Sequence, residues 1–142
     1  MEPLSSRLNG VELLYDRLKQ AWKAVAGNLG GNWSYEKGSW DVALDEGHNY
    51  WLRIPFRVIK GRLDGEADQN DAIVRLEQPF VLHHEPRRLP VPNSEDTMTI
   101  LPALFNQFQS PAVVDGPIHA STMELARVQL KLLEKPIIAI KI

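Results

Sequence analysis

The stretch NYWLRIPFRVIK, residues 49–60, decides the fold because its side chains alternate with a period of two. Successive side chains of a β-strand point to opposite faces of the sheet, so this stretch predicts a strand with two different faces. One face carries Tyr50, Leu52, Ile54, Phe56 and Val58. The other face carries Trp51, Arg53, Pro55, Arg57 and Ile59. The sequence therefore predicts a half-buried strand of an antiparallel sheet, with a bulge or an unpaired position at Pro55.

The preceding stretch GGNWSYEKGSWD, residues 30–41, predicts a β-hairpin that turns at Lys37-Gly38. A two-residue loop, or a four-residue loop of the same parity, would pair Tyr35 with Trp40. This register places all the large apolar side chains on one face, which is what a half-buried hairpin requires. We therefore expect Trp33, Tyr35 and Trp40 to form one aromatic cluster that faces the first helix.

Residues 72–84 predict a fourth strand that is interrupted at Pro79, because proline cannot donate a ladder hydrogen bond. Its expected inward side chains are Val74, Leu76, Phe80, Leu82 and His84. Its expected outward side chains are Arg75, Glu77, Val81 and His83. Residues 86–117 hold six of the ten prolines and predict a long irregular crossing, with one short helix around residues 101–108.

Helical spacing of apolar residues predicts a helix near each end of the chain. The first runs over residues 10–26, with Asn9 as its N-cap and Gly27-Asn28 as its stop. The second runs over residues 118–134 and is apolar around more than half of its circumference, so two of its sides should be buried. We expect Pro136 to end it and residues 137–142 to form a final short strand.

This order of elements predicts one α+β domain over residues 1–142. We expect an antiparallel meander of about four to five strands, with the N-terminal helix and the C-terminal helix packed on the same sheet face. The opposite face mixes charged and apolar side chains, which is typical of a surface that meets another subunit.

The composition excludes several classes of function. The chain has 142 residues, a net charge of −2 and no cysteine. A negative net charge disfavours nucleic acids and anionic membranes as partners. The absence of cysteine excludes disulfides, thiolate metal sites and a cysteine nucleophile. The N-terminus lacks the features of a secretion signal, and no apolar run approaches the roughly 18–20 residues that span a bilayer. We therefore expect a soluble cytoplasmic protein.

Four segments in this order resemble the YugN-like family of small bacterial proteins. They are GGNWSYEKGSWD (30–41), LRIPF (52–56), VRLEQPFVLHH (74–84) and FNQFQSP (105–111). The resemblance spans about residues 8–134 and implies a compact α+β domain in the cytoplasm. The family has no established activity, so the resemblance implies no catalytic residues.

Arginine side chains mark the candidate site on the mixed sheet face. Arg53 and Arg57 share one strand face, and Arg75 lies on the corresponding face of the next strand. Three guanidinium groups there could bind a carboxylate or a phosphate bidentately. Alternatively, they pair with Glu77 and nearby acids. The full candidate set for ligand binding or an interface is Trp51, Arg53, Arg57, Arg75, Glu77 and His83.

Other chemistries are less well supported by the sequence. In His83-His84-Glu85, adjacent strand residues point to opposite faces and should not share one metal ion. The alternation of Asp64, Glu66 and Asp68 resembles a calcium loop, but Gln69 stands where an EF-hand requires glycine. Neither a phosphate-binding loop nor a nucleophile elbow is present. We therefore expect no catalytic residue, no metal and no cofactor.

Two hypotheses follow for the function. The first is a non-enzymatic binding or protein-interaction domain that forms a homodimer, through the arginine-bearing sheet face or the broad apolar side of the last helix. The alternative is a small anionic-ligand-binding protein, or an unrecognised enzyme, that uses the same arginines.

Overall fold

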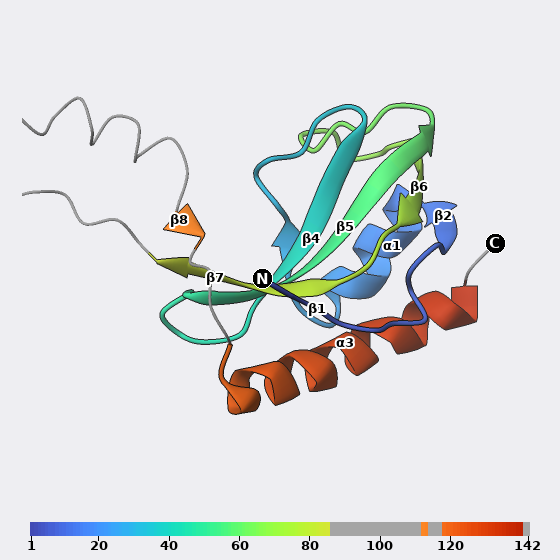
Figure 1. Cartoon of the computed structure of the whole chain (residues 1–142). Helices are drawn as coiled ribbons and strands as arrows, with labels where there is room; N and C mark the ends of the chain where they lie inside the picture. The colour runs from blue at the N-terminus through green and yellow to red at the C-terminus, as the bar shows by residue number, and fades with distance from the viewer. Residues whose placement is uncertain (86–111, 114–117, 141–142) are drawn as a thin grey trace, which may run out of the picture.

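The computed structural model describes residues 1–85, 112–113 and 118–140 of the chain. They form an α+β fold in which two helices accompany an antiparallel sheet (Figure 1). The helices are α1 (Tyr15–Lys23) and α3 (Ala120–Ile140). Buried side chains of both helices join one hydrophobic core with the inward side chains of the sheet. The predicted class and the packing of both helices against one sheet face are therefore confirmed.

The sheet has more strands than the four to five that the sequence predicts. Its path is β1-β7-β5-β4-β3, and β2 joins it through β6. The strands are β1 (Glu2–Pro3), β2 (Glu12–Leu14), β3 (Asn28–Leu29), β4 (Lys37–Ala43), β5 (Tyr50–Lys60), β6 (Ile73–Leu76), β7 (Phe80–Glu85) and β8 (Ala112–Val113). The additional strands are short edge segments, which carry too few residues to show a period of two. The short helix predicted around residues 101–108 lies outside the described residues.

The central strand is β5, as its alternating pattern predicts. It pairs with β4 on one side and with both β6 and β7 on the other. Leu52, Ile54 and Phe56 are fully buried. Each such side chain contributes roughly 1.5–3 kcal/mol of hydrophobic stabilisation. This strand therefore fixes which sheet face is the core.

The predicted break at Pro79 is confirmed, but it reverses the faces that follow it. Phe56 pairs with Leu76, and Arg53 pairs with Phe80, so three steps along β5 match four steps along its partner. One extra residue in a strand is a β-bulge and moves every later side chain to the other face. The predicted inward positions of Phe80 and Leu82 are therefore wrong, and Val81 is fully buried in the core instead.

The hairpin register predicted for residues 30–41 is wrong. Lys37 and Gly38 belong to β4 and pair with β5, while the preceding strand is only the two-residue β3. Trp40 is fully buried and packs 5.9 Å from Trp22 of α1 between ring centroids, so it faces the first helix as predicted. Trp33 and Tyr35 lie in the connecting loop instead and contact each other, with centroids 6.3 Å apart.

A close backbone approach explains that loop. The Gly30 N–H donates to the Ser39 carbonyl at 2.8 Å. A Cβ atom at Gly30 would lie only 2.7 Å from Oδ2 of Asp41 and from Oγ of Ser39, so a larger residue would have to displace these two side chains. Farther along the loop, the carbonyl of Tyr35 accepts from the Leu63 N–H at 3.1 Å. These long-range contacts outweigh the local turn preference of Lys37-Gly38.

The first helix is shorter than the predicted range 10–26. Gly10 has φ of +88°, and Glu12 to Leu14 pair with β6 as strand β2. The predicted N-cap Asn9 is therefore wrong, because Leu14 precedes the helix, and Glu12 bonds to Arg75 across the sheet. The buried stripe Tyr15, Leu18 and Trp22 follows the predicted helical spacing.

The last helix begins two residues later than predicted and continues through Pro136 to Ile140. The predicted strand at 137–142 is therefore wrong for residues 137–140, and the last two residues lie outside the described part. Leu133 and Ile137 are fully buried, and their burial offsets the roughly 3 kcal/mol cost of proline inside a helix. The Trp22 Nε1–H also donates to the Leu133 carbonyl at 2.9 Å, within the turn that Pro136 perturbs.

Trp22→Phe tests this contact between the helices. We expect it to lower the free energy of unfolding by about 1–3 kcal/mol, because the buried Leu133 carbonyl loses a hydrogen bond. Trp51→Phe is the matched control. It removes a solvent-exposed hydrogen bond from Nε1 of Trp51 to the carbonyl of His48. The free energy of unfolding should therefore fall by less than about 0.5 kcal/mol. Urea unfolding measures both, and equal losses would contradict the account.

Candidate functional site

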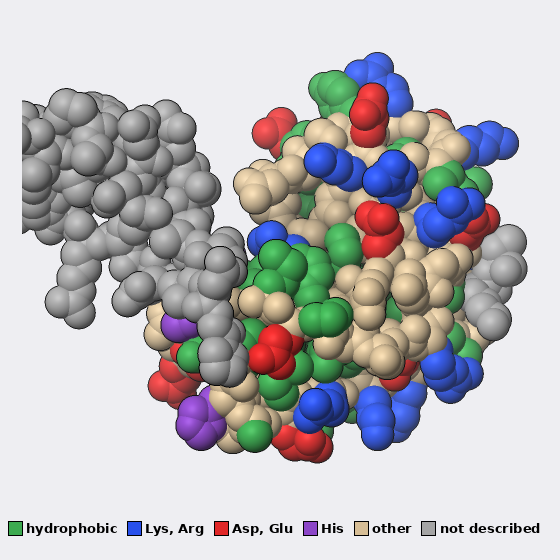
Figure 2. Space-filling view, in the orientation of Figure 1, with side chains coloured by type: hydrophobic (Ala, Val, Ile, Leu, Met, Phe, Trp, Pro, Cys, Tyr) green, Lys and Arg blue, Asp and Glu red, His purple; other side chains and the backbone are tan. Residues whose placement is uncertain are grey.

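Four of the six predicted site residues share one surface of the sheet, as predicted. Trp51, Arg53 and Arg57 alternate along β5 with its buried residues, and Arg75 pairs directly with Arg57. We call this surface, opposite the two helices, the outer face. Figure 2 shows Lys and Arg side chains gathered where Figure 1 places β4, β5 and β6.

Arg53 is already occupied by a carboxylate. It pairs with Asp41 of β4 through Nε to Oδ1 at 2.9 Å and Nη2 to Oδ2 at 3.0 Å. The Ser39 hydroxyl donates to the same carboxylate at 3.0 Å. Only 24% of the Arg53 side chain and 13% of the Asp41 side chain are exposed. A bidentate pair of this kind holds its charges strongly, so Arg53 is not available to an external anion.

A row of three cations crosses the outer face beyond Arg53. Lys37 of β4 pairs with Arg57 of β5, and Arg57 pairs with Arg75 of β6. All three are exposed, and neighbouring strands lie about 4.8 Å apart. We call Lys37, Arg57 and Arg75 the cation row. Lys37 is absent from the site residues predicted from the sequence, because Lys37-Gly38 is typical of a turn and is expected in the hairpin loop.

Among the ion pairs that the described residues form, only one end of the cation row, Arg75, has a counter-charge. Nε of Arg75 donates to Oε2 of Glu12 at 2.7 Å, and both side chains are exposed. Within the described part of the chain, Lys37 and Arg57 form no ion pair. Like charges directly opposite each other on adjacent strands are destabilising. The row therefore weakens the fold slightly and keeps a positive potential on this face.

His83 does not belong to this surface, contrary to the prediction. Its partner in the register is Tyr50, and their rings stack with centroids 4.3 Å apart. The β-bulge before β7 causes this reversal. Glu77 lies in the bulge itself, where its main-chain N–H donates to the carbonyl of Pro55 at 2.8 Å.

His84 takes the place on the outer face that His83 was expected to hold. Burial lowers the pKa of His84, and the neighbouring positive charge of Arg53 lowers it further. Its Nε2 atom is buried with no hydrogen-bond partner in the described residues. His83 and His84 thus diverge, and no three His, Asp or Glu groups in the described ranges are arranged to hold a metal ion.

Two of the cavities that described residues line open elsewhere on the surface. One, of about 510 Å³, is lined by Asp16, Arg62, Asp64, Ala67, Gln69, Asn70 and Asp71. In this loop, Oδ1 of Asp64 accepts from the Glu66 N–H at 3.0 Å, and Oδ2 of Asp16 accepts from the Asn70 N–H at 2.9 Å. These carboxylates order the loop itself.

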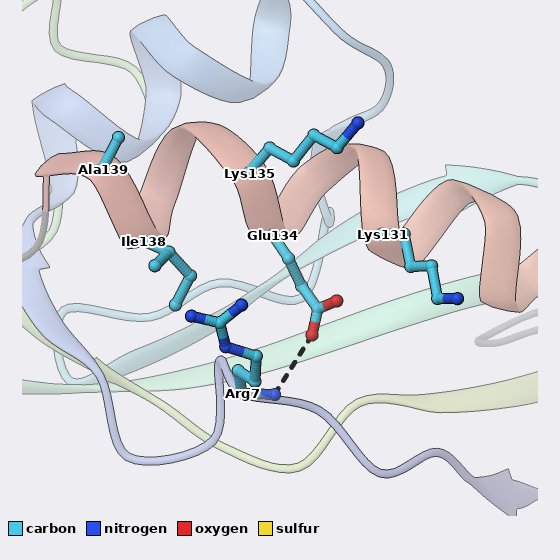
Figure 3. A pocket seen from close by; sticks show the side chains of 6 residues that line it. All are labelled: Arg7, Lys131, Glu134, Lys135, Ile138 and Ala139. Atoms are coloured by element: carbon cyan, nitrogen blue, oxygen red, sulfur yellow. Dashed lines mark hydrogen bonds between the residues drawn. The ribbon is translucent and has the colours of Figure 1, made fainter.

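The other cavity, of about 530 Å³, lies between the N-terminal segment and the end of α3. It is lined by Arg7, Lys131, Glu134, Lys135, Ile138 and Ala139 (Figure 3). We call it the N-terminal pocket. Its size lies in the range typical of small-molecule sites.

The described helices include none that is both long enough and apolar enough to cross a bilayer.

A pair of variants separates the two kinds of arginine on the outer face. Arg53→Gln should destabilise the fold by about 1–3 kcal/mol, because it leaves the largely buried Asp41 carboxylate without its cation. Arg57→Gln should leave stability unchanged or raise it by up to about 1 kcal/mol, because it relieves like-charge repulsion. High salt should remove that gain. Urea unfolding at two salt concentrations is the measurement; equal destabilisation by both variants would refute the assignment.

Comparisons with known proteins agree with the resemblance carried by the sequence. The model of the YugN-like family matches residues 3–137. The uncharacterized protein YugN of Bacillus subtilis (strain 168) is 31% identical over 137 residues, which cover 94% of this chain and 96% of that protein. The crystal structure of the uncharacterized conserved protein YugN from Geobacillus kaustophilus HTA426 shares the fold. Its TM-score is 0.65, at 15% identity over 99% of this chain and 97% of that one. The chain belongs to the YugN-like family.

Proposed function

We propose that this protein is a cytoplasmic, non-enzymatic interaction domain that forms a homodimer through the outward side of α3. The observation that carries the proposal is a stripe of exposed apolar side chains on this helix. Leu125, Val128 and Leu132 are 51%, 49% and 44% exposed. Large apolar side chains grouped on one surface are typical of protein–protein contacts. We call these three residues the outer seam.

The outer seam lies on the side of α3 that is turned away from the buried residues. The buried residues are Met123, Ala126, Leu130, Leu133 and Ile137, which alternate in steps of three and four. Each outer-seam residue follows a buried one by two positions, which is a rotation of about 200° around the helix. The same alternation of three and four governs coiled-coil packing. The helix therefore has one seam for its own core and a second seam for another helix.

A second copy of the same chain fits the outer seam. In an antiparallel pair centred on Val128, Leu125 of one copy meets Leu132 of the other. The same arrangement brings Glu124 of one copy near Lys131 of the other, and both of these side chains are exposed. Opposite charges that flank an apolar seam set the orientation of helix pairs. The geometry of the helix is thus complementary to itself under a two-fold axis.

The outer face of the sheet is a poorer interface between two copies. A two-fold axis through the cation row would bring Lys37 and Arg57 of one copy against the same cations of the other. Like-charge contacts of this kind cost several kcal/mol at an interface. Arg53, which the sequence placed in the interface set, is already paired with Asp41. We therefore place the dimer contact on α3.

Substitution of the outer seam tests the homodimer. Wild-type protein should sediment as a concentration-dependent dimer of the 16.1 kDa chain, because a single helix pair buries a small interface and associates weakly. Val128→Lys with Leu132→Lys should leave a monomer with unchanged circular dichroism. Val25→Lys is the matched control, since Val25 is also exposed but is not part of α3. A wild-type monomer at every concentration would sink the proposal.

The second candidate function is the binding of an anionic ligand to the cation row. Specific support comes from Lys37 and Arg57, two neighbouring cations without a carboxylate partner in the described residues. Guanidinium groups bind phosphate and carboxylate oxygens bidentately. In this version of the hypothesis Lys37 replaces Arg53, whose charge is neutralised.

Pyrophosphate is a suitable probe for this second candidate. At constant ionic strength it should raise the melting temperature of the wild type and have little effect on Arg57→Gln. Arg17→Gln, which removes an exposed arginine from α1, should keep the full response. Equal responses in all three proteins would show a non-specific salt effect and exclude the site.

A further inference from the structure

The N-terminal pocket joins two parts of the chain that are far apart in sequence. Ser6 Oγ donates to Oε2 of Glu134 at 2.9 Å, and the main-chain N–H of Arg7 donates to the same oxygen at 3.1 Å. Figure 3 shows the Arg7 side chain from the N-terminal segment lying below α3, with Glu134 pointing down toward the Arg7 main chain. These bonds hold the Arg7 side chain at the mouth of the pocket.

The lining of this pocket carries an excess of positive charge. Arg7, Lys131 and Lys135 are cations, whereas Glu134 is the one anion among the six lining residues. None of the three cations forms an ion pair within residues 1–85, 112–113 and 118–140. Glu134 already uses one oxygen to hold the N-terminal segment. The pocket therefore has cationic donors free for an external anion.

An apolar wall completes the pocket. Ile138 and Ala139 line its end toward the C-terminus of α3. Figure 3 shows Ile138 directed toward the Arg7 guanidinium, and Lys131 on the same lower side of the helix. Apolar walls with a few charged groups are typical of sites for small organic ligands.

We propose that the N-terminal pocket binds a small amphiphilic anion. Its carboxylate or phosphate head contacts Arg7 and Lys131, and its short apolar body packs on Ile138, which lies on the same side of the helix as these two cations. Lys135 contributes positive potential from the rim. This site goes beyond the proposed homodimer and does not require it, because the outer seam contributes none of the six lining residues.

Isothermal titration with hexyl phosphate and hexanoate, at fixed ionic strength, tests the site. Methyl phosphate is the control for the apolar wall, and wild type should bind it more weakly than hexyl phosphate. Arg7→Gln and Lys131→Gln should each weaken binding of the hexyl probes on the order of fivefold, the effect of one nearby charge in a solvated site. Glu134→Gln should strengthen binding by a similar factor, because it removes the opposing charge and keeps an acceptor oxygen.

Two further variants separate this site from the other proposals. Arg57→Gln removes a cation from the cation row and should leave binding of the hexyl probes unchanged. Val128→Lys with Leu132→Lys should abolish the dimer, and binding of the hexyl probes should again be unchanged. Failure of both hexyl probes to bind wild type would overturn the site. So would affinities for them that are the same in Arg7→Gln, Glu134→Gln and wild type.

Discussion

Trp22 lies where the sheet and both helices meet. Its ring packs on Trp40 of β4, and its indole N–H donates to the Leu133 carbonyl of α3. Because the side chain is fully buried, neither contact can be replaced by water. This position fixes the rotation of α3 about its own axis. The buried seam must then face Trp22 and the sheet, so the outer seam must face away from both.

The opposite side of the sheet depends on a different constraint, the single extra residue between β6 and β7. This β-bulge allows β5 to pair with both β6 and β7, and it turns His83 inward to Tyr50. The outer face is consequently divided in two. Near β7 it carries Trp51 and the buried Leu82, and near β6 it carries the cation row. Charge is thus concentrated on one part of the face, where it is available to solvent.

The periodic patterns of β5 and α1 predicted the buried faces of these two elements correctly, whereas the faces predicted for β7 were reversed. The alternation of β5 and the stripe Tyr15, Leu18 and Trp22 are confirmed. In each element only one orientation buries all of the apolar side chains of that face. The errors occur where tertiary contacts outweigh local preference. Lys37-Gly38 is typical of a turn, but Gly30 and Tyr35 anchor the loop before it. Proline ends most helices, but α3 continues beyond Pro136. The buried Ile137 and the hydrogen bond from Trp22 to the Leu133 carbonyl stabilise the helix there.

In the candidate site too, some features could be predicted from the period of the sequence and others depend on tertiary contacts. Arg57 and Arg75 could be placed together from strand parity, whereas the pairing of Arg53 with Asp41 required the register of β4 against β5. The N-terminal pocket had no sequence signal, because Arg7 and Lys131 come to line one pocket only after the chain has folded.

The central claim is that the outer seam of α3 is the contact between two copies, and a disulfide tests it most directly. The chain has no cysteine, so a single introduced thiol is unambiguous. A two-fold axis at Val128 brings this residue to its own counterpart, within the separation that a disulfide requires. On mild oxidation V128C should form a covalent dimer much faster than V25C. Equal and slow cross-linking of the two variants would contradict the account.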